Sequence, residues 1–160
     1  MTLGFPLLVD LKGNNCTVFG GGSAALRRVK ELLRFGAKVT VISPQIGPEL
    51  AQLSETGTIR HSPRKYFRGD CSNSQLCVAA TDDNALNIAI STECKNKGIP
   101  VNVTSPRSYG NFTFPRMVLT DNAVLTITGA LSAEELDALK DHLQEILPTI
   151  IKDICTNDEE

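Results

Sequence analysis

Residues 17–28, Thr-Val-Phe-Gly-Gly-Gly-Ser-Ala-Ala-Leu-Arg-Arg, predict a short strand, a tight glycine turn and the start of a helix. Gly20, Gly22 and Ala25 fit the G-x-G-x-x-G/A spacing that is typical of dinucleotide-binding sites. The first glycine permits a sharp exit from the strand, the second allows close approach of a diphosphate, and the small alanine permits tight helix packing. The N–H groups at the helix N-terminus then face the phosphates. The predicted cofactor-binding residues here are Gly20, Gly21, Gly22, Ser23 and Ala24.

A glycine turn that merely joins a strand to a helix is the alternative interpretation of this motif. The surrounding sequence favours the dinucleotide site, because a helical pattern follows the turn and a second apolar strand is expected at residues 38–42. These elements complete a βαβ unit of ordinary length.

Strands alternate with helices up to residue 103, which predicts a Rossmann-like, doubly wound parallel sheet. Strands are expected at residues 16–19, 39–42, 58–61, 75–80 and 99–103, and helices at 23–34, 48–55 and from about 84 to 97. Beyond residue 105 we expect an antiparallel strand pair at 117–120 and 123–128, then a helix that Pro148 kinks or ends. This gives a dinucleotide-binding domain at 1–110 and a dimerisation segment at 111–160.

Composition narrows the classes of function. The chain has 160 residues, a net charge of −2 and five cysteines, with no C-x-x-C pair and only two histidines. Nothing here favours nucleic acid as a partner, and the spacing predicts neither a metal site nor a disulfide framework. No apolar run approaches about twenty residues, and the start lacks signal-peptide features. The sequence therefore predicts a cytoplasmic protein that does not enter a membrane.

Several stretches of the chain carry a resemblance to one family. They are residues 6–11 (PLLVDL), 20–28 (GGGSAALRR), 79–83 (AATDD), 98–103 (GIPVNV) and 112–115 (FTFP). Together they resemble precorrin-2 dehydrogenase, the NAD-dependent module of siroheme synthase, over about residues 5–127. The resemblance implies oxidation of the tetrapyrrole precorrin-2 to sirohydrochlorin with NAD, a homodimer built partly from the segment after the sheet, and in some members insertion of ferrous iron.

This resemblance, together with the expected sheet, assigns further site residues. The nicotinamide is expected at the carboxyl edge of the sheet, near Thr81 and Asp82. The tetrapyrrole carries many carboxylates, for which cationic side chains are suitable partners. The predicted substrate-binding residues are Asn102, Arg107 and Arg116.

The choice of dinucleotide is open at this point. An acidic residue at the end of the second strand would bind a ribose 2′-OH, but Ser43, Pro44 and Gln45 stand there instead. We expect these three residues to contact the cofactor. The resemblance implies NAD, and the residues themselves do not distinguish NAD from NADP.

Two departures from the family motivate a second hypothesis. Ser105 occupies the position of the aspartate that the family uses in dehydrogenation and chelation, and a serine hydroxyl is neither an effective general base nor a strong metal ligand. This argues against iron insertion. The sequence also ends soon after one helix, where the family adds a helical domain. The alternative is therefore a catalytically degenerate dinucleotide-binding partner or sensor of another tetrapyrrole enzyme.

Overall fold

The computed structural model describes residues 4–120 and 123–156. The chain divides into two compact units, Leu7–Thr113 and a second unit of Met1–Pro6 with Phe114–Glu160. We call them the sheet unit and the C-terminal unit and describe each by itself.

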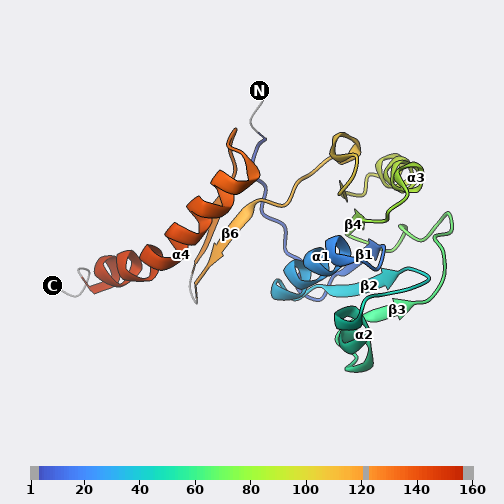
Figure 1. Cartoon of the computed structure of the whole chain (residues 1–160), viewed down its shortest axis with the longest axis horizontal. Helices are drawn as coiled ribbons and strands as arrows, with labels where there is room; N and C mark the ends of the chain where they lie inside the picture. The colour runs from blue at the N-terminus through green and yellow to red at the C-terminus, as the bar shows by residue number, and fades with distance from the viewer. Residues whose placement is uncertain (1–3, 121–122, 157–160) are drawn as a thin grey trace. The chain divides into compact units, whose positions relative to one another are not determined.

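The sheet unit contains five parallel strands in the order β3-β2-β1-β4-β5, several of which are labelled in Figure 1. This order places the first strand in the centre and confirms the predicted Rossmann-like fold. The central strands are buried on both faces, as expected for a parallel sheet covered on two sides. The bounds are β1 Asn15–Phe19, β2 Lys38–Ile42, β3 Arg60–Ser62, β4 Leu76–Ala79 and β5 Val101–Val103.

Three helices connect these strands. Helix α1 (Ser23–Arg34) packs on β1 and β2 through its buried apolar stripe, and α3 (Asn84–Asn96) packs on β4 and β5. Helix α2 (Pro48–Glu55) has proline in its first turn, where the missing N–H needs no partner. The side chain of Asp83 caps α3 by accepting hydrogen bonds from the backbone N–H groups of residues 85 and 86.

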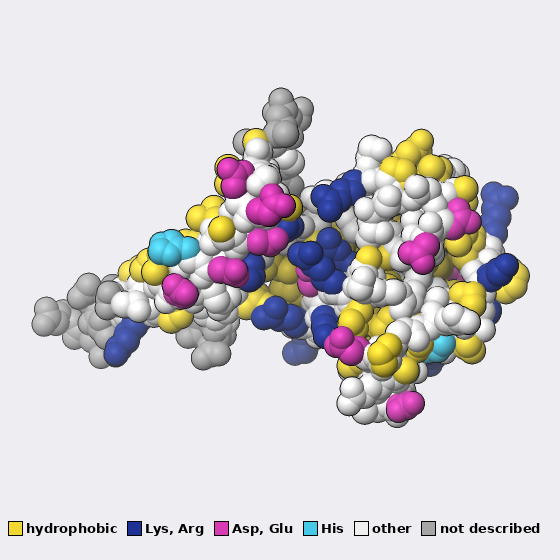
Figure 2. Space-filling model, in the orientation of Figure 1, with side chains coloured by type: hydrophobic (Ala, Val, Ile, Leu, Met, Phe, Trp, Pro, Cys, Tyr) yellow, Lys and Arg dark blue, Asp and Glu magenta, His cyan; other side chains and the backbone are white. Residues whose placement is uncertain are grey.

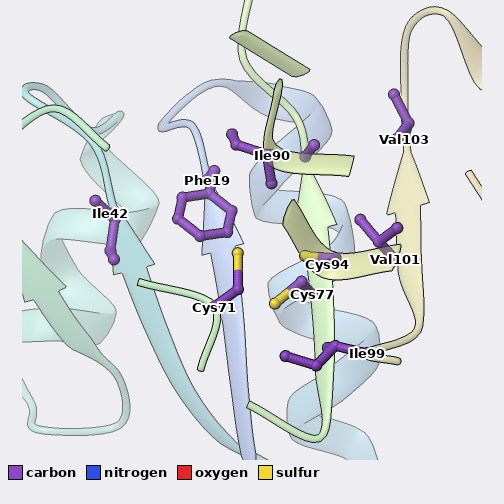
Figure 3. Packing of buried hydrophobic residues seen from close by; sticks show 10 residues of the cluster. Phe19, Ile42, Cys71, Cys77, Ile90, Cys94, Ile99, Val101 and Val103 are labelled. Carbon is purple, nitrogen blue, oxygen red and sulfur yellow. The ribbon is translucent and has the colours of Figure 1, made fainter. Parts of the chain in front are cut away.

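One part of the core lies between α3 and the strands β1, β4 and β5. Phe19 and Ile90 are fully buried there together with three cysteines, as Figure 3 shows. The ring of Tyr66 closes this cluster by packing edge-on against Phe19, with ring centroids 5.5 Å apart.

The connection from β3 to β4 contains no helix, and residues 63–75 cross as a loop. Arg64 forms two hydrogen bonds with Asp70, of 2.7 and 2.8 Å, which close the loop on itself. Glu93 on α3 accepts hydrogen bonds from the Tyr66 hydroxyl and, at 2.9 Å, from the backbone N–H of Gly69. Side-chain contacts therefore hold the loop against the sheet unit. We call residues 63–75 the crossover loop.

In the C-terminal unit, β6 (Arg116–Leu119) pairs antiparallel with β7 (Val124–Ile127), which confirms the predicted strand pair. The turn expected at residues 121–122 lies outside the described residues. Helix α4 (Ala133–Thr156) packs along β6 (Figure 1).

Helix α4 runs through Pro148, so of the two outcomes expected there, a kink or an end, the helix does not end, and the kink stays a prediction. Proline removes one backbone donor, but the turns on either side keep their own hydrogen bonds. Because half-buried apolar residues precede and follow the proline, packing favours continuing the helix beyond it.

Candidate functional site at the carboxyl ends of the strands

The glycine turn between β1 and α1 is wedged against two neighbouring segments. Gly20 has φ +114°, and a Cβ there would lie 2.2 Å from the carbonyl oxygen of Ala80. A Cβ on Gly21 would lie 2.0 Å from the carbonyl oxygen of Gln45. Side chains are thus excluded at both positions by backbone, although the motif itself fixes only Gly20 of these two. At Gly22 a Cβ would meet nothing within 4 Å, so its backbone faces open space.

The N-terminus of α1 offers hydrogen-bond donors at this open position. Gly22 is its N-cap, no side chain caps it, and the first turn holds no acidic residue. The first N–H groups of a helix have no partner within the helix. Ser23 and Ala24 are exposed, whereas Ala25 is fully buried against the sheet. This geometry suits an anion such as a diphosphate.

Positive side chains lie along helix α1. Lys and Arg gather over α1 in Figure 2, where the helix carries Arg27, Arg28, Lys30 and Arg34. Glu31 pairs with two of them, at 3.5 Å from Arg27 and 2.5 Å from Arg28, and Glu49 pairs with Lys30 at 2.5 Å. Because Arg34 lies in the last turn, the donors for an anion at the helix N-terminus are its backbone N–H groups.

The end of β2 is neutral. Ser43 is buried, and its hydroxyl donates a 2.6 Å hydrogen bond to the carbonyl oxygen of Gln45. The side chains of Pro44 and Gln45 are exposed. The Gly47 N–H donates to the Gly21 carbonyl at 2.9 Å, which ties this loop to the glycine turn. The predicted contact residues therefore adjoin the turn, and no carboxylate among them favours one dinucleotide over the other.

A buried asparagine joins the ends of β4 and β5. Asn87 Oδ1 accepts hydrogen bonds from the Thr81 N–H at 3.1 Å and the Thr81 hydroxyl at 2.7 Å. Its Nδ2 donates to the carbonyl oxygens of Thr81 and Ser105, both at 2.9 Å. The side chain is 0% exposed, so all its hydrogen bonds are made inside the protein. Asn87 thereby fixes two residues predicted for the site.

Asn87 was missed in the sequence. The available signal is its position on α3, where residues 87, 90, 91 and 94 are all buried and so share the face that meets the sheet. A polar residue on such a face needs internal hydrogen bonds, which makes it a candidate for a structural or site role.

The remaining predicted residues have different surroundings. Asp82 and Ser105 are exposed at the strand ends, and Arg107 is exposed in a short 3₁₀ turn at Arg107–Tyr109. Arg116 belongs to the C-terminal unit, where its guanidinium binds the Asp137 carboxylate at 2.6 and 3.1 Å. Their roles toward a cofactor or substrate stay predictions.

Asn102, a predicted substrate-binding residue, is buried with an incomplete set of hydrogen bonds. It is 6% exposed, and its Nδ2 donates to the Phe112 carbonyl at 3.1 Å. Its Oδ1 is buried, and no donor among the described residues reaches it. A buried acceptor without a donor costs about 1–3 kcal/mol, so a donor from a ligand or water would stabilise this position.

Within residues 4–120 and 123–156, no helix is both long and apolar enough to cross a membrane.

Comparison with known proteins identifies relatives of the whole arrangement. Residues 7–116 match the family described as "Putative NAD(P)-binding". The siroheme synthases of Chromobacterium violaceum and Thioalkalivibrio sulfidiphilus are 31% and 37% identical over 90% of this chain, which covers 31% and 30% of their lengths. The chain thus spans about a third of these curated relatives.

A solved structure, "SirC, precorrin-2 dehydrogenase", is 30% identical and aligns with a TM-score of 0.71, over 89% of this chain and 70% of that one. The comparison with SirC supports the fold described above, a parallel sheet followed by an antiparallel strand pair and a helix. The chain belongs to the family of NAD(P)-binding modules that includes the N-terminal part of siroheme synthase and the precorrin-2 dehydrogenase SirC.

Proposed function

We propose that this protein oxidises precorrin-2 to sirohydrochlorin with NAD as the hydride acceptor. The observation that carries the proposal is the open backbone at Gly22, on an uncapped helix N-terminus beside the strand ends that Asn87 joins. The similarity to SirC, named as a precorrin-2 dehydrogenase, supports the same substrate class.

The chain's contribution is binding and positioning. The N–H groups of residues 22–24 would hold the diphosphate, and the segment 43–45 would contact the adenosine ribose. The bound nicotinamide would supply a hydride acceptor. Thr81 and Ser105, fixed by Asn87, would set the position of the tetrapyrrole against that acceptor. The proton lost from the substrate would pass to solvent, because the exposed Ser105 hydroxyl is a poor general base.

The direct test has two steps. The purified full chain is titrated separately with NAD and NADP, and precorrin-2 is then added while absorbance follows NADH and sirohydrochlorin together. We expect NAD binding and equimolar formation of both products. Binding without turnover would contradict the proposed enzyme.

The second candidate function, a dinucleotide-binding partner or sensor, is motivated by Ser105 at the position of the family aspartate. It predicts cofactor binding without dehydrogenation, and a tetrapyrrole enzyme that co-purifies with this chain. The titration with precorrin-2 separates the two candidates.

Replacing Ser105 by aspartate is expected to raise the rate of precorrin-2 oxidation by about tenfold, because a carboxylate at this strand end can accept a proton. The Ser105 side chain is exposed, so the change should leave the free energy of unfolding nearly constant. Stopped-flow absorbance measures the rate. The matched control is Ser108→Asp, another exposed serine nearby; an equal gain there would refute the positional argument.

We further propose that the C-terminal unit mediates a homodimer. Helix α4 leaves Leu139, Ile150 and Ile154 between 37% and 60% exposed, an apolar face that a second copy would cover. Sedimentation at micromolar concentration is expected to show a dimer for the wild type and a monomer for Ile150→Glu. The control is His142→Glu, at an exposed polar position of α4, which should remain dimeric. A monomeric wild type would overturn this proposal.

A further inference from the structure

Three cysteines that are separated in the sequence meet in the core of the sheet unit. Cys71 comes from the crossover loop, Cys77 from β4 and Cys94 from α3. Their sulfur atoms all lie within 4.8 Å of one another. Figure 3 shows the three side chains gathered in the middle of the apolar cluster. We call them the three-cysteine cluster.

The cluster is reduced and enclosed. Each of its cysteines is a free thiol and is 0% exposed. Interaction with Cys77 and burial together raise the pKa of the Cys71 thiol, and interaction with Cys71 and burial raise that of Cys94 to about 12. For Cys77, the contact with Cys71 lowers the pKa, but the contact with Cys94 and burial leave it at about 12. Without an ion the thiols are therefore neutral.

Their spacing fits a three-coordinate ion. With metal–sulfur bonds of about 2.3 Å, a planar three-sulfur site separates the sulfur atoms by about 4.0 Å. The cluster reaches this spacing through side-chain movements of less than about 1 Å, which protein cores accommodate on binding a metal.

The scaffold around Cys71 is already ordered. Asp70, beside it, is held by Arg64 and by the Phe67 N–H, and the Ser74 N–H donates to the Cys71 carbonyl at 3.1 Å. The Ser74 hydroxyl lies 2.6 Å from that of Thr17 on β1. With both sides of Cys71 fixed, little conformational entropy remains to be lost when an ion binds.

The crossover loop also provides a route from solvent. Asp70, Asn73 and Ser74 line a groove of about 920 Å³ over β1, β2 and β3. Cys71 lies in the same loop, between Asp70 and Asn73, although its own side chain is buried and does not line the groove. A small opening of the loop would admit an ion.

We propose that Cys71, Cys77 and Cys94 form a binding site for one soft, thiophilic metal ion, with Cu(I) as the best match. Sulfur ligands select soft ions, and Cu(I) accepts three of them without a fourth. A structural zinc ion takes four ligands, whereas the group found among the described residues has three.

The test is an anaerobic Cu(I) titration of the full chain against a competing Cu(I) chelator. We expect one ion per chain and X-ray absorption showing three sulfur neighbours at about 2.3 Å. The double variant Cys71→Ser/Cys94→Ser should bind on the order of 100-fold more weakly, because only one sulfur ligand remains.

Two controls separate the cluster from other thiols. Cys16→Ser changes a buried thiol on β1 outside the cluster, and Cys155→Ser changes the remaining cysteine of the chain; both should bind Cu(I) like the wild type. If the double variant fails to fold, the number of sulfur neighbours that X-ray absorption measures in the wild type still tests the site. A count of two or fewer, or no binding against the chelator, would overturn the site.

Discussion

Replacing Gly20 by alanine is expected to destabilise the protein by about 3 kcal/mol or more and to abolish dinucleotide binding. The added Cβ would lie 2.2 Å from the Ala80 carbonyl oxygen, and φ of +114° is strained for any L side chain. Because the Cβ position is fixed by the backbone of residue 20 and the Ala80 oxygen is itself a backbone atom, relief requires moving the ends of β1 and β4 apart. Urea unfolding and calorimetric titration with NAD measure the two effects.

Gly22→Ala is the informative companion to this variant. Its φ of −87° and ψ of −169° are accessible to alanine, and its Cβ meets nothing in the protein. Stability should therefore change by less than about 1 kcal/mol, whereas NAD binding should weaken at least about tenfold because the methyl occupies the space of the diphosphate. Unchanged NAD binding in Gly22→Ala would show that the glycine turn does not contact the cofactor.

Replacing Asn87 by alanine is expected to cost about 2–4 kcal/mol of stability and to lower kcat for precorrin-2 oxidation about tenfold. The change removes the Oδ1 acceptor of the Thr81 N–H and hydroxyl and the Nδ2 donor to the Thr81 and Ser105 carbonyl oxygens. The strand ends would then lose the link that sets their separation. Asn87 is a positioning residue in this account, so kcat should change more than KM.

The controls for Asn87 test that interpretation. Asn96→Ala, at an exposed position of the same helix, should leave stability and rate nearly unchanged. Asn87→Asp keeps the acceptor but turns a carboxylate oxygen toward two carbonyl oxygens, so it should be at least as destabilising as alanine at neutral pH. Activity that survives in Asn87→Ala at wild-type kcat would show that the asparagine is structural alone.

The parts of the fold that the sequence predicted well have strong local signals. The bounds of α1 and α2 agree with the prediction because a periodic apolar face, Gly36 and Pro48 mark their limits. The short strand β3 was expected at residues 58–61 and lies at Arg60–Ser62, since an edge strand with few apolar residues has little pattern to align.

Only those parts of the site that consecutive residues form could be predicted from the sequence. The glycine turn is continuous in the sequence and was located correctly, including the sharp exit from the strand at Gly20, where φ is +114°. The link through Asn87 and the three-cysteine cluster both depend on how α3 lies across β4, which no spacing motif encodes. Long-range packing therefore contributes the interactions that sequence reasoning could not find.

The crossover loop has a consequence for how the molecule opens. A helical crossover would form a continuous ladder of backbone hydrogen bonds, but this loop has only scattered ones, such as that from Ser74 N–H to the Cys71 carbonyl. The side chains of Arg64, Tyr66 and Glu93 provide its other attachments. Subglobal fluctuations concentrate where backbone bonding is sparse. Amide hydrogens in this loop should therefore exchange with deuterium well before those of β1 and β4. Each local opening of the loop would also briefly expose the thiols of the three-cysteine cluster to water.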